Sequence, residues 1–322
     1  HTWTAAKKEA LSTETVISVF AILFALAALC AAVRAVVLDL HTPFVPSAHI
    51  ASSTHTAPPY GFLPRMQTPS ARTLLTVFAV AFVSRAMLCV AAWLFLVCAR
   101  GVTPERIASP FDLLVQWDAS NYLSIAETGY QTQGDARFLI VFYPLYPLLI
   151  RTARLLFPSY TSAALAVSWL CFSGASALLY ALAYADGDVS YARRAVKYLL
   201  LTPFGIFFAA PFTESLFLLL CAAYFYAVRC RYFLLAALAG VLAALTRMQG
   251  ILLLVPAAVA LGYSWRAAYL AAFPSSVPHS ALHRSARARA ILRAFPVRML
   301  PLCAVPLGTL AYLFVNRTVT GN

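Results

Sequence analysis

Three short polar segments interrupt an otherwise apolar chain, and each carries an ionisable side chain suited to proton transfer or anion binding. They are QWDASNYLSIAETGY at 116–130, PFTESLFLLL at 211–220 and TRMQG at 246–250. Asp118 in the first segment could accept a proton from a hydroxyl group, as a general base does. Arg247 in the third presents a planar fork of donors that fits a phosphate. These residue types favour a reaction in which a hydroxyl is activated beside an anionic headgroup.

Each of these side chains also has a purely structural interpretation. Aspartate is a favoured helix N-cap, so Asp118 could cap a helix, and Trp117 with Tyr122 has the spacing of a hydrophobic staple. Glu214 would complement the dipole at a helix start, although an ionisable residue at membrane depth usually faces a cavity or a partner. Arg247 could extend its charged end to the membrane interface. Both interpretations stay open for the sequence.

The stretch around YPLYP at 143–147 adds further basic and aromatic side chains. The basic ones are Arg137, Arg151 and Arg154, and the aromatic ones are Phe142, Tyr143 and Tyr146. The arginines could bind an anionic headgroup or anchor the chain at the membrane interface. The aromatic residues would ordinarily form an interfacial belt, and a platform for a sugar is the alternative.

No metal site and no nucleotide cofactor are predicted. Asp186 and Asp188 form DGD, the spacing with which many sugar-nucleotide transferases hold a metal-bound nucleotide sugar, but basic connectors surround it and favour a solvated loop. The seven cysteines lie inside or at the ends of apolar runs without a CxxC pair, and the six histidines lie at 1–55 and 279–283. These positions keep both residue types away from the acidic clusters.

Composition predicts an all-α, polytopic membrane protein. Of the 322 residues, 62% are hydrophobic and only 11% charged, whereas a soluble domain has about a quarter of its residues charged. The net charge of +13 comes largely from arginines and lysines in short connectors between apolar runs. That distribution is typical of the positive-inside rule, in which lysines and arginines keep their connectors in the cytoplasm. The positive charge is therefore explained by membrane topology, and no nucleic-acid partner is expected.

The apolar runs predict roughly seven to nine spanning or half-spanning helices. The candidate runs are 16–38, 73–99, 160–184, 198–210, 213–228, 232–246, 250–264 and 299–315. Pro144 and Pro147 should break a helix between 138 and 151, within an external loop that contains short helices. With the basic connectors 185–197, 229–231 and 265–298 placed in the cytoplasm, the three polar segments should meet in one extracytoplasmic pocket.

Several segments taken in order resemble the PIG-V family of mannosyltransferases. They are QWDASNYLSIAETGY, RFLIVFYPLYPLLIR, LTPFGIFFAAPFTESLF and LTRMQG. The resemblance covers about residues 73–322 and implies a GT-C-like fold, which these membrane-embedded glycosyltransferases share. It further implies a polyprenyl- or dolichyl-phosphate mannose as donor, a hydroxyl on a lipid or glycan as acceptor, and a reaction at the outer face without a bound nucleotide. A divalent metal is not predicted, and the sequence leaves metal dependence open.

The resemblance also suggests roles for individual residues. Asp118 matches the acid in the first external loop that is the usual candidate base of this class. Trp117 would line the site, and Glu214 and Arg247 match positions that the family tends to retain. The predicted substrate-binding set is Trp117, Tyr122, Tyr143, Glu214, Arg247 and Arg137. An inverting displacement is the expected mechanism, since the base activates the acceptor directly.

Two parts of the chain depart from the family pattern. Residues 1–72 are expected to be an N-terminal extension with one candidate transmembrane helix and a flexible linker. Residues 73–322 are expected to be the catalytic domain, truncated at its C-terminus because VTGN at 319–322 is similar to the start of a further external segment. TRMQG and VTGN are closer to bacterial members, which favours a bacterial cytoplasmic membrane, with the endoplasmic reticulum as the alternative.

Two other classes of protein remain open. In a transporter or flippase, Glu214 and Arg247 would bind a substrate or proton near the midplane, and the chain should contain pseudo-symmetric halves. In a structural membrane subunit, removal of the charge at Asp118 should change stability alone.

Overall fold

A computed structural model describes residues 67–100, 110–272 and 296–321, and the regular structure in these ranges is helical throughout. The all-α prediction is therefore confirmed for the described part of the chain. The predicted span at 16–38, nearly all of the linker and most of the basic loop at 265–298 lie outside it.

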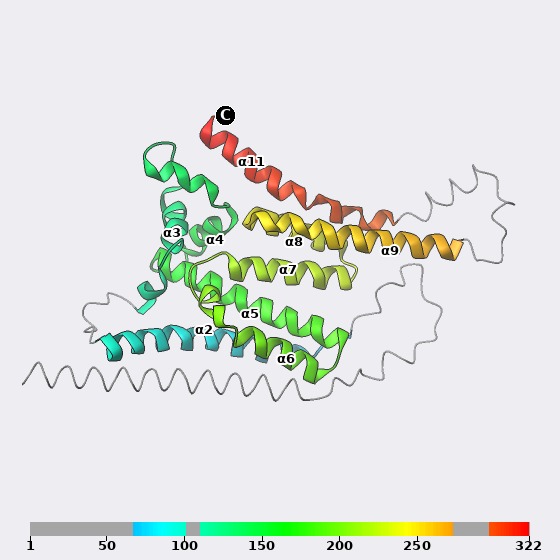
Figure 1. Cartoon of the computed structure of the whole chain (residues 1–322), viewed down its shortest axis with the longest axis horizontal. Helices are drawn as coiled ribbons and strands as arrows, with labels where there is room; N and C mark the ends of the chain where they lie inside the picture. Colours follow the sequence, from blue (N-terminus) through cyan, green and yellow to red (C-terminus); the bar gives the residue numbers. More distant parts are fainter. Residues whose placement is uncertain (1–66, 101–109, 273–295, 322) are drawn as a thin grey trace, which may run out of the picture.

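The described chain contains both long helices and short helical segments (Figure 1). The first half contains α2 (Ala71–Arg100), η3 (Pro110–Leu114), α3 (Ala119–Thr128), η4 (Asp135–Val141), α4 (Leu145–Ala153) and α5 (Tyr160–Asp186). The second half contains α6 (Val189–Leu200), η5 (Pro203–Phe208), α7 (Glu214–Arg229), α8 (Phe233–Thr246), η6 (Met248–Leu253), α9 (Leu254–Ala272), η8 (Val297–Ala304) and α11 (Pro306–Thr320). The elements labelled η are 3₁₀ helices.

Four described helices are long and apolar enough to cross a bilayer, and these indicate a membrane protein. They cover Ala71–Phe95, Tyr160–Asp186, Met248–Leu270 and Val297–Thr320, and a fifth span is possible if η4 and α4 count together. The predicted seven to nine spans are not confirmed. Helices α7 and α8 have 16 and 14 residues, or about 21–24 Å, whereas the hydrocarbon core is about 30 Å thick.

The expected helix at 198–210 does not form as one element. Helix α6 ends at Leu200, and only the 3₁₀ turns of η5 follow. Pro203 explains the interruption, because the residue before a proline is driven toward extended backbone, and Thr202 has φ −56° and ψ 135°. The proline break predicted in YPLYP is present, since the axes of η4 and α4 differ by 108°.

The long helices pack side by side in one bundle (Figure 1). Helix α5 contacts α2, α6 and α7; α7 contacts α8; and α8 contacts η8 and α11. Small residues permit the last approach: a Cβ on Gly308 would overlap the carbonyl oxygen of Val241, and one on Gly240 would lie 2.7 Å from Val305. Small residues at helix contacts are typical of membrane bundles, where backbone proximity replaces hydrophobic burial.

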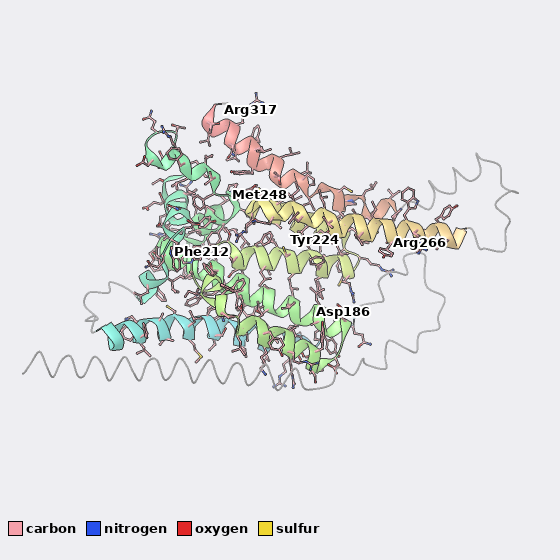
Figure 2. The ribbon with its side chains drawn as sticks, in the orientation of Figure 1. Asp186, Phe212, Tyr224, Met248, Arg266 and Arg317 are labelled. Atoms are coloured by element: carbon pink, nitrogen blue, oxygen red, sulfur yellow. The ribbon has the colours of Figure 1, made fainter. Side chains whose placement is uncertain are left out.

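The bundle has two distinct ends (Figure 2). Phe212 and Met248 lie at one end, beside α3 and α4, and we call this the α3 end. Asp186 and Arg266 lie at the opposite end, which we call the Asp186 end. The three polar segments are thus at one end, and the DGD segment is at the other, as the charge distribution predicted.

Candidate functional site

Asp118 is exposed at the first position before α3, but it does not act as a helix cap. It occupies the N-cap position with helical backbone angles (φ −69°, ψ −10°) and makes no capping hydrogen bond through its side chain. A stabilising cap would accept a hydrogen bond from a backbone N–H two or three residues further on. The carboxylate is therefore exposed and is not used as a helix cap.

Trp117 has an unusual backbone conformation for a bulky residue. Its φ is 49°, in the left-handed region, and its side chain is 71% exposed. Such a conformation costs a non-glycine residue about 1–2 kcal/mol, and conformations of this kind cluster at functional sites. The indole faces the ring of Phe207 in η5, with centroids 6.2 Å apart. A large exposed aromatic surface is thus held beside Asp118 at a cost in stability.

Glu214 and Arg247 form an ion pair between two helix ends. Nη1 of Arg247 donates to Oε1 of Glu214 at 2.6 Å, and the two side chains are 31% and 30% exposed. Glu214 is the first residue of α7, so it also complements the positive end of that helix. Arg247 lies at the break between α8 and η6, with extended backbone (φ −152°, ψ 149°). Glu214 therefore both complements the helix dipole and pairs with a cation, the two roles that the sequence left open.

Gly250 explains why the chain can place Arg247 at this break. The 3₁₀ turns of η6 fold back onto the end of α8, where a Cβ on Gly250 would overlap the backbone of Ala243 and Ala244. The N–H of Gly250 donates to the carbonyl of Arg247 at 2.9 Å and holds the turn closed. The glycine in Arg-x-x-Gly is therefore required by close backbone approach.

Tyr122 of α3 joins the carboxylate at 118 to the ion pair. Burial raises the pKa of its phenol, a hydrogen bond with Thr213 acts in the opposite direction, and the charges of Glu214, Arg247 and Asp118 also act on it. The phenol is therefore within electrostatic reach of all three charges. A phenol is protonated near pH 7 even without this shift, so Tyr122 can donate a hydrogen bond.

Aromatic and backbone contacts hold α3 against the YPLYP segment. The ring of Tyr122 packs edge-on against Phe142 at 5.0 Å and Tyr146 at 5.3 Å. Tyr130 donates to the carbonyl of Phe142 at 2.6 Å, after Gly129 has ended α3 with φ 76°. The motif glycine is needed for this left-handed turn. The first two motif segments are therefore one structural unit.

Four predicted anion or sugar ligands have other contacts. Tyr143 stacks on Tyr312 of α11, with centroids 3.9 Å apart, so it faces the last helix. The guanidinium of exposed Arg137 lies over the ring of Phe138 at 4.7 Å. Arg151 donates to two carbonyls at the end of α3, those of Ala126 at 2.8 Å and Glu127 at 2.9 Å. Arg154 donates to the carbonyl of Phe157 at 2.8 Å.

Both acids of DGD have structural roles. Asp186 pairs with Arg229 at 2.6 Å, and Asp188 caps α6 by accepting from the N–H of Tyr191 at 2.8 Å. Within the described ranges, no group of three or more His, Cys, Asp or Glu side chains could hold a metal ion.

The sequence interpretation missed two buried residues that support the site. Thr213 is only 2% exposed and reaches Tyr122, although the sequence suggested no more than a helix start. Arg85 in α2 is also 2% exposed, and it donates to the carbonyls of Gly205 at 2.8 Å and Leu200 at 3.2 Å. An arginine in the middle of an apolar run was the available signal, because such residues are retained for a partner.

Arg85 holds the interrupted segment that leads to the site. Its guanidinium satisfies carbonyls at the end of α6 and in η5, and it lies 4.4 Å from the centre of the Phe172 ring. At the other end of η5, Trp169 donates to the carbonyl of Ala209 at 2.8 Å. These contacts fix η5, whose Phe207 packs on Trp117. The short segment after η5 leads to Glu214, the first residue of α7.

The molecule is thus a helical membrane protein with an exposed carboxylate, a neutral phenol and a half-buried carboxylate–guanidinium pair at one end of its bundle. No protein-family model, curated protein or solved structure matches this chain.

Proposed function

We propose that this chain is a membrane glycosyltransferase that moves a mannose from a polyprenyl- or dolichyl-phosphate donor to a hydroxyl of a lipid or glycan acceptor. One observation carries the proposal: the Glu214–Arg247 ion pair, closed at 2.6 Å between residues far apart in the sequence, lies at the same end of the bundle as α3, which the exposed Asp118 precedes. The order of the motif segments and their resemblance to PIG-V mannosyltransferases suggest the donor. The reaction would take place on the extracytoplasmic face, in a bacterial cytoplasmic membrane or the endoplasmic reticulum.

The proposed reaction is a single displacement at the anomeric carbon. A carboxylate oxygen of Asp118 takes the proton from the acceptor hydroxyl, and the hydroxyl oxygen forms a new bond to that carbon. The bond from the carbon to the phosphate oxygen breaks, and its electron pair leaves with the lipid phosphate. Arg247 stabilises the departing phosphate, because charge-assisted hydrogen bonds to phosphate are strong where water is scarce. The configuration of the sugar is inverted.

The remaining residues of the site orient the two charged groups. Glu214 uses one donor of Arg247 and leaves the rest of the planar fork for the phosphate. Tyr122, a partly buried phenol of α3, would donate a hydrogen bond to a sugar oxygen. The exposed indole of Trp117 offers an apolar face on which a sugar ring can pack.

The test compares Asp118→Asn with Asp135→Asn, which removes an exposed acid from the start of η4. Membranes that contain the full-length protein are given radiolabelled polyprenyl-phosphate mannose and lipid acceptors. We expect Asp118→Asn to lose about 10²–10⁴-fold of the transfer rate, the usual contribution of a general base. We expect Asp135→Asn to transfer at the wild-type rate. Equal rates for a folded Asp118→Asn variant and wild type would show that Asp118 is not the base.

The break at Arg247 favours a second candidate function. Interrupted helices with charged residues at the break are common in transporters, so the chain could be a flippase of an anionic lipid-linked substrate. Reconstituted vesicles with a fluorescent polyprenyl-phosphate sugar distinguish the two functions. Movement of the label between leaflets, without transfer to an acceptor, would favour the flippase.

A further inference from the structure

A groove at the Asp186 end combines two basic side chains with apolar walls. It lies where α6 packs beside α2 and α5, and its volume is about 280 Å³. Its lining includes Val77, Tyr180, Arg193, Lys197, Leu200 and Leu201. The groove lies at the end of the bundle opposite to the proposed transferase site, and that function makes no use of it.

Charge and apolar surface are separated along this groove. Arg193 and Lys197 are four residues apart, so they lie on the same face of α6. Helix α6 starts at the Asp186 end and runs back along the bundle (Figure 1). The two cations therefore lie nearer the end of the molecule, and Leu200 and Leu201 lie deeper.

The depth of the groove matches the boundary between lipid headgroups and acyl chains. Helix α5 has 27 residues, so it is roughly 40 Å long and extends about 5 Å beyond each side of a 30 Å hydrocarbon core. Tyr180 precedes the end of α5 at Asp186 by about 9 Å, which places it a few ångströms inside the hydrocarbon. Val77 lies equally far from the start of α2. Arg193 and Lys197 follow the start of α6 at Val189 by about 6 and 12 Å along the helix axis. A phosphate between them would therefore lie at about the level of Tyr180, where long basic side chains can extend toward the headgroups.

We propose that this groove binds one anionic phospholipid from the leaflet at the Asp186 end. The phosphate diester lies between Arg193 and Lys197, and the beginning of the acyl chains lies on Val77, Leu200 and Leu201. Basic pockets between transmembrane helices recognise lipid headgroups in this way. The volume is at the small end of the range for ligand pockets, about 300–1,000 Å³, and suits a headgroup with the first part of its chains. A zwitterionic lipid would place its own cation against the same two side chains.

The experiment measures lipid affinity of the full-length protein in detergent by native mass spectrometry. We expect phosphatidylglycerol to bind at least about tenfold more tightly than phosphatidylcholine. Each cation near an anionic headgroup contributes about fivefold, so the double variant Arg193→Gln/Lys197→Gln should lose roughly thirtyfold in affinity for phosphatidylglycerol. Arg298→Gln removes an exposed cation of η8 outside the groove and should bind like wild type.

A second variant keeps both cations and fills the apolar part. Leu201 is partly exposed, so Leu201→Trp can fold and should also lose phosphatidylglycerol. Wild-type affinity in either groove variant, or equal affinity of wild type for the two lipids, would overturn the proposal. Glycerol 3-phosphate is the soluble control. If it displaces phosphatidylglycerol at similar concentrations, the site binds a free anion and the lipid proposal is wrong.

Discussion

The backbone of Trp117 gives the site its most specific prediction at the scale of a single residue. Its φ of 49° is unfavourable for alanine as well as tryptophan, and glycine adopts it freely. Trp117→Gly should therefore be about 1 kcal/mol more stable than Trp117→Ala, although both variants lose the indole and should lose transfer. Thermal unfolding of the two variants in detergent checks the difference. If Trp117→Ala is equally stable, the positive φ is not present in the folded protein.

Tyr122 predicts a change in stability at alkaline pH. Its pKa is raised in the folded state, chiefly by burial, so the folded protein keeps the phenol neutral where the unfolded chain already ionises. The corresponding stability is fully present below about pH 10 and is lost as pH rises through the folded pKa. The free energy of unfolding of wild type should fall more between pH 9 and pH 11 than that of Tyr122→Phe. If the free energy of unfolding falls equally in wild type and in Tyr122→Phe, the phenol of Tyr122 is exposed to water and the prediction is wrong.

The break between α8 and η6 is the element on which the position of Arg247 depends. Gly250→Ala would force a Cβ into the backbone of Ala243 and Ala244, so the turn must open and carry Arg247 away from Glu214. We expect a loss of about 1–3 kcal/mol in stability, as in other overpacked sites, together with reduced transfer. Gly262→Ala in α9 is the matched control, since a Cβ there has nothing within 4 Å. The prediction fails if the two variants unfold at the same temperature.

At the scale of elements, the sequence predicted long helices well and short ones poorly. The apolar runs of α2 and α5 exceed the bilayer thickness, so length alone identifies them. The proline break at 144–147 was also predictable, because proline lacks the N–H that a helix needs. The run at 198–210 was wrong as a helix: its composition is apolar, but Pro203 interrupts it and Arg85, far away in sequence, satisfies the exposed carbonyls.

The side-chain contacts of the site depend on tertiary packing that no local pattern contains. The sequence singled out Asp118, Glu214 and Arg247, and the charge distribution put them at one end. It could not show how Tyr122 is held, since its ring contacts with Phe142 and Tyr146 require α3 to pack on the YPLYP segment. It also left Tyr143 among the sugar ligands, whereas its stacking on Tyr312 is set by the docking of α11.

At the scale of the whole molecule, the bundle separates two kinds of chemistry. The α3 end holds the acid, the phenol and the ion pair, while the Asp186 end holds structural pairs and a basic groove. In the proposed enzyme the long helices keep the lipid part of the donor beside the bundle and bring its phosphate to Arg247. Both acids of DGD, at the Asp186 end, already pair with Arg229 or cap α6.

The most direct measurement is the initial rate of mannose transfer by membranes that contain the wild-type chain, with either polyprenyl-phosphate mannose or GDP-mannose as donor. A lipid-phosphate-dependent enzyme should use the first donor and show no transfer above background with the second. Transfer from GDP-mannose alone, or no transfer from the lipid donor to any hydroxyl acceptor, would contradict the proposed function.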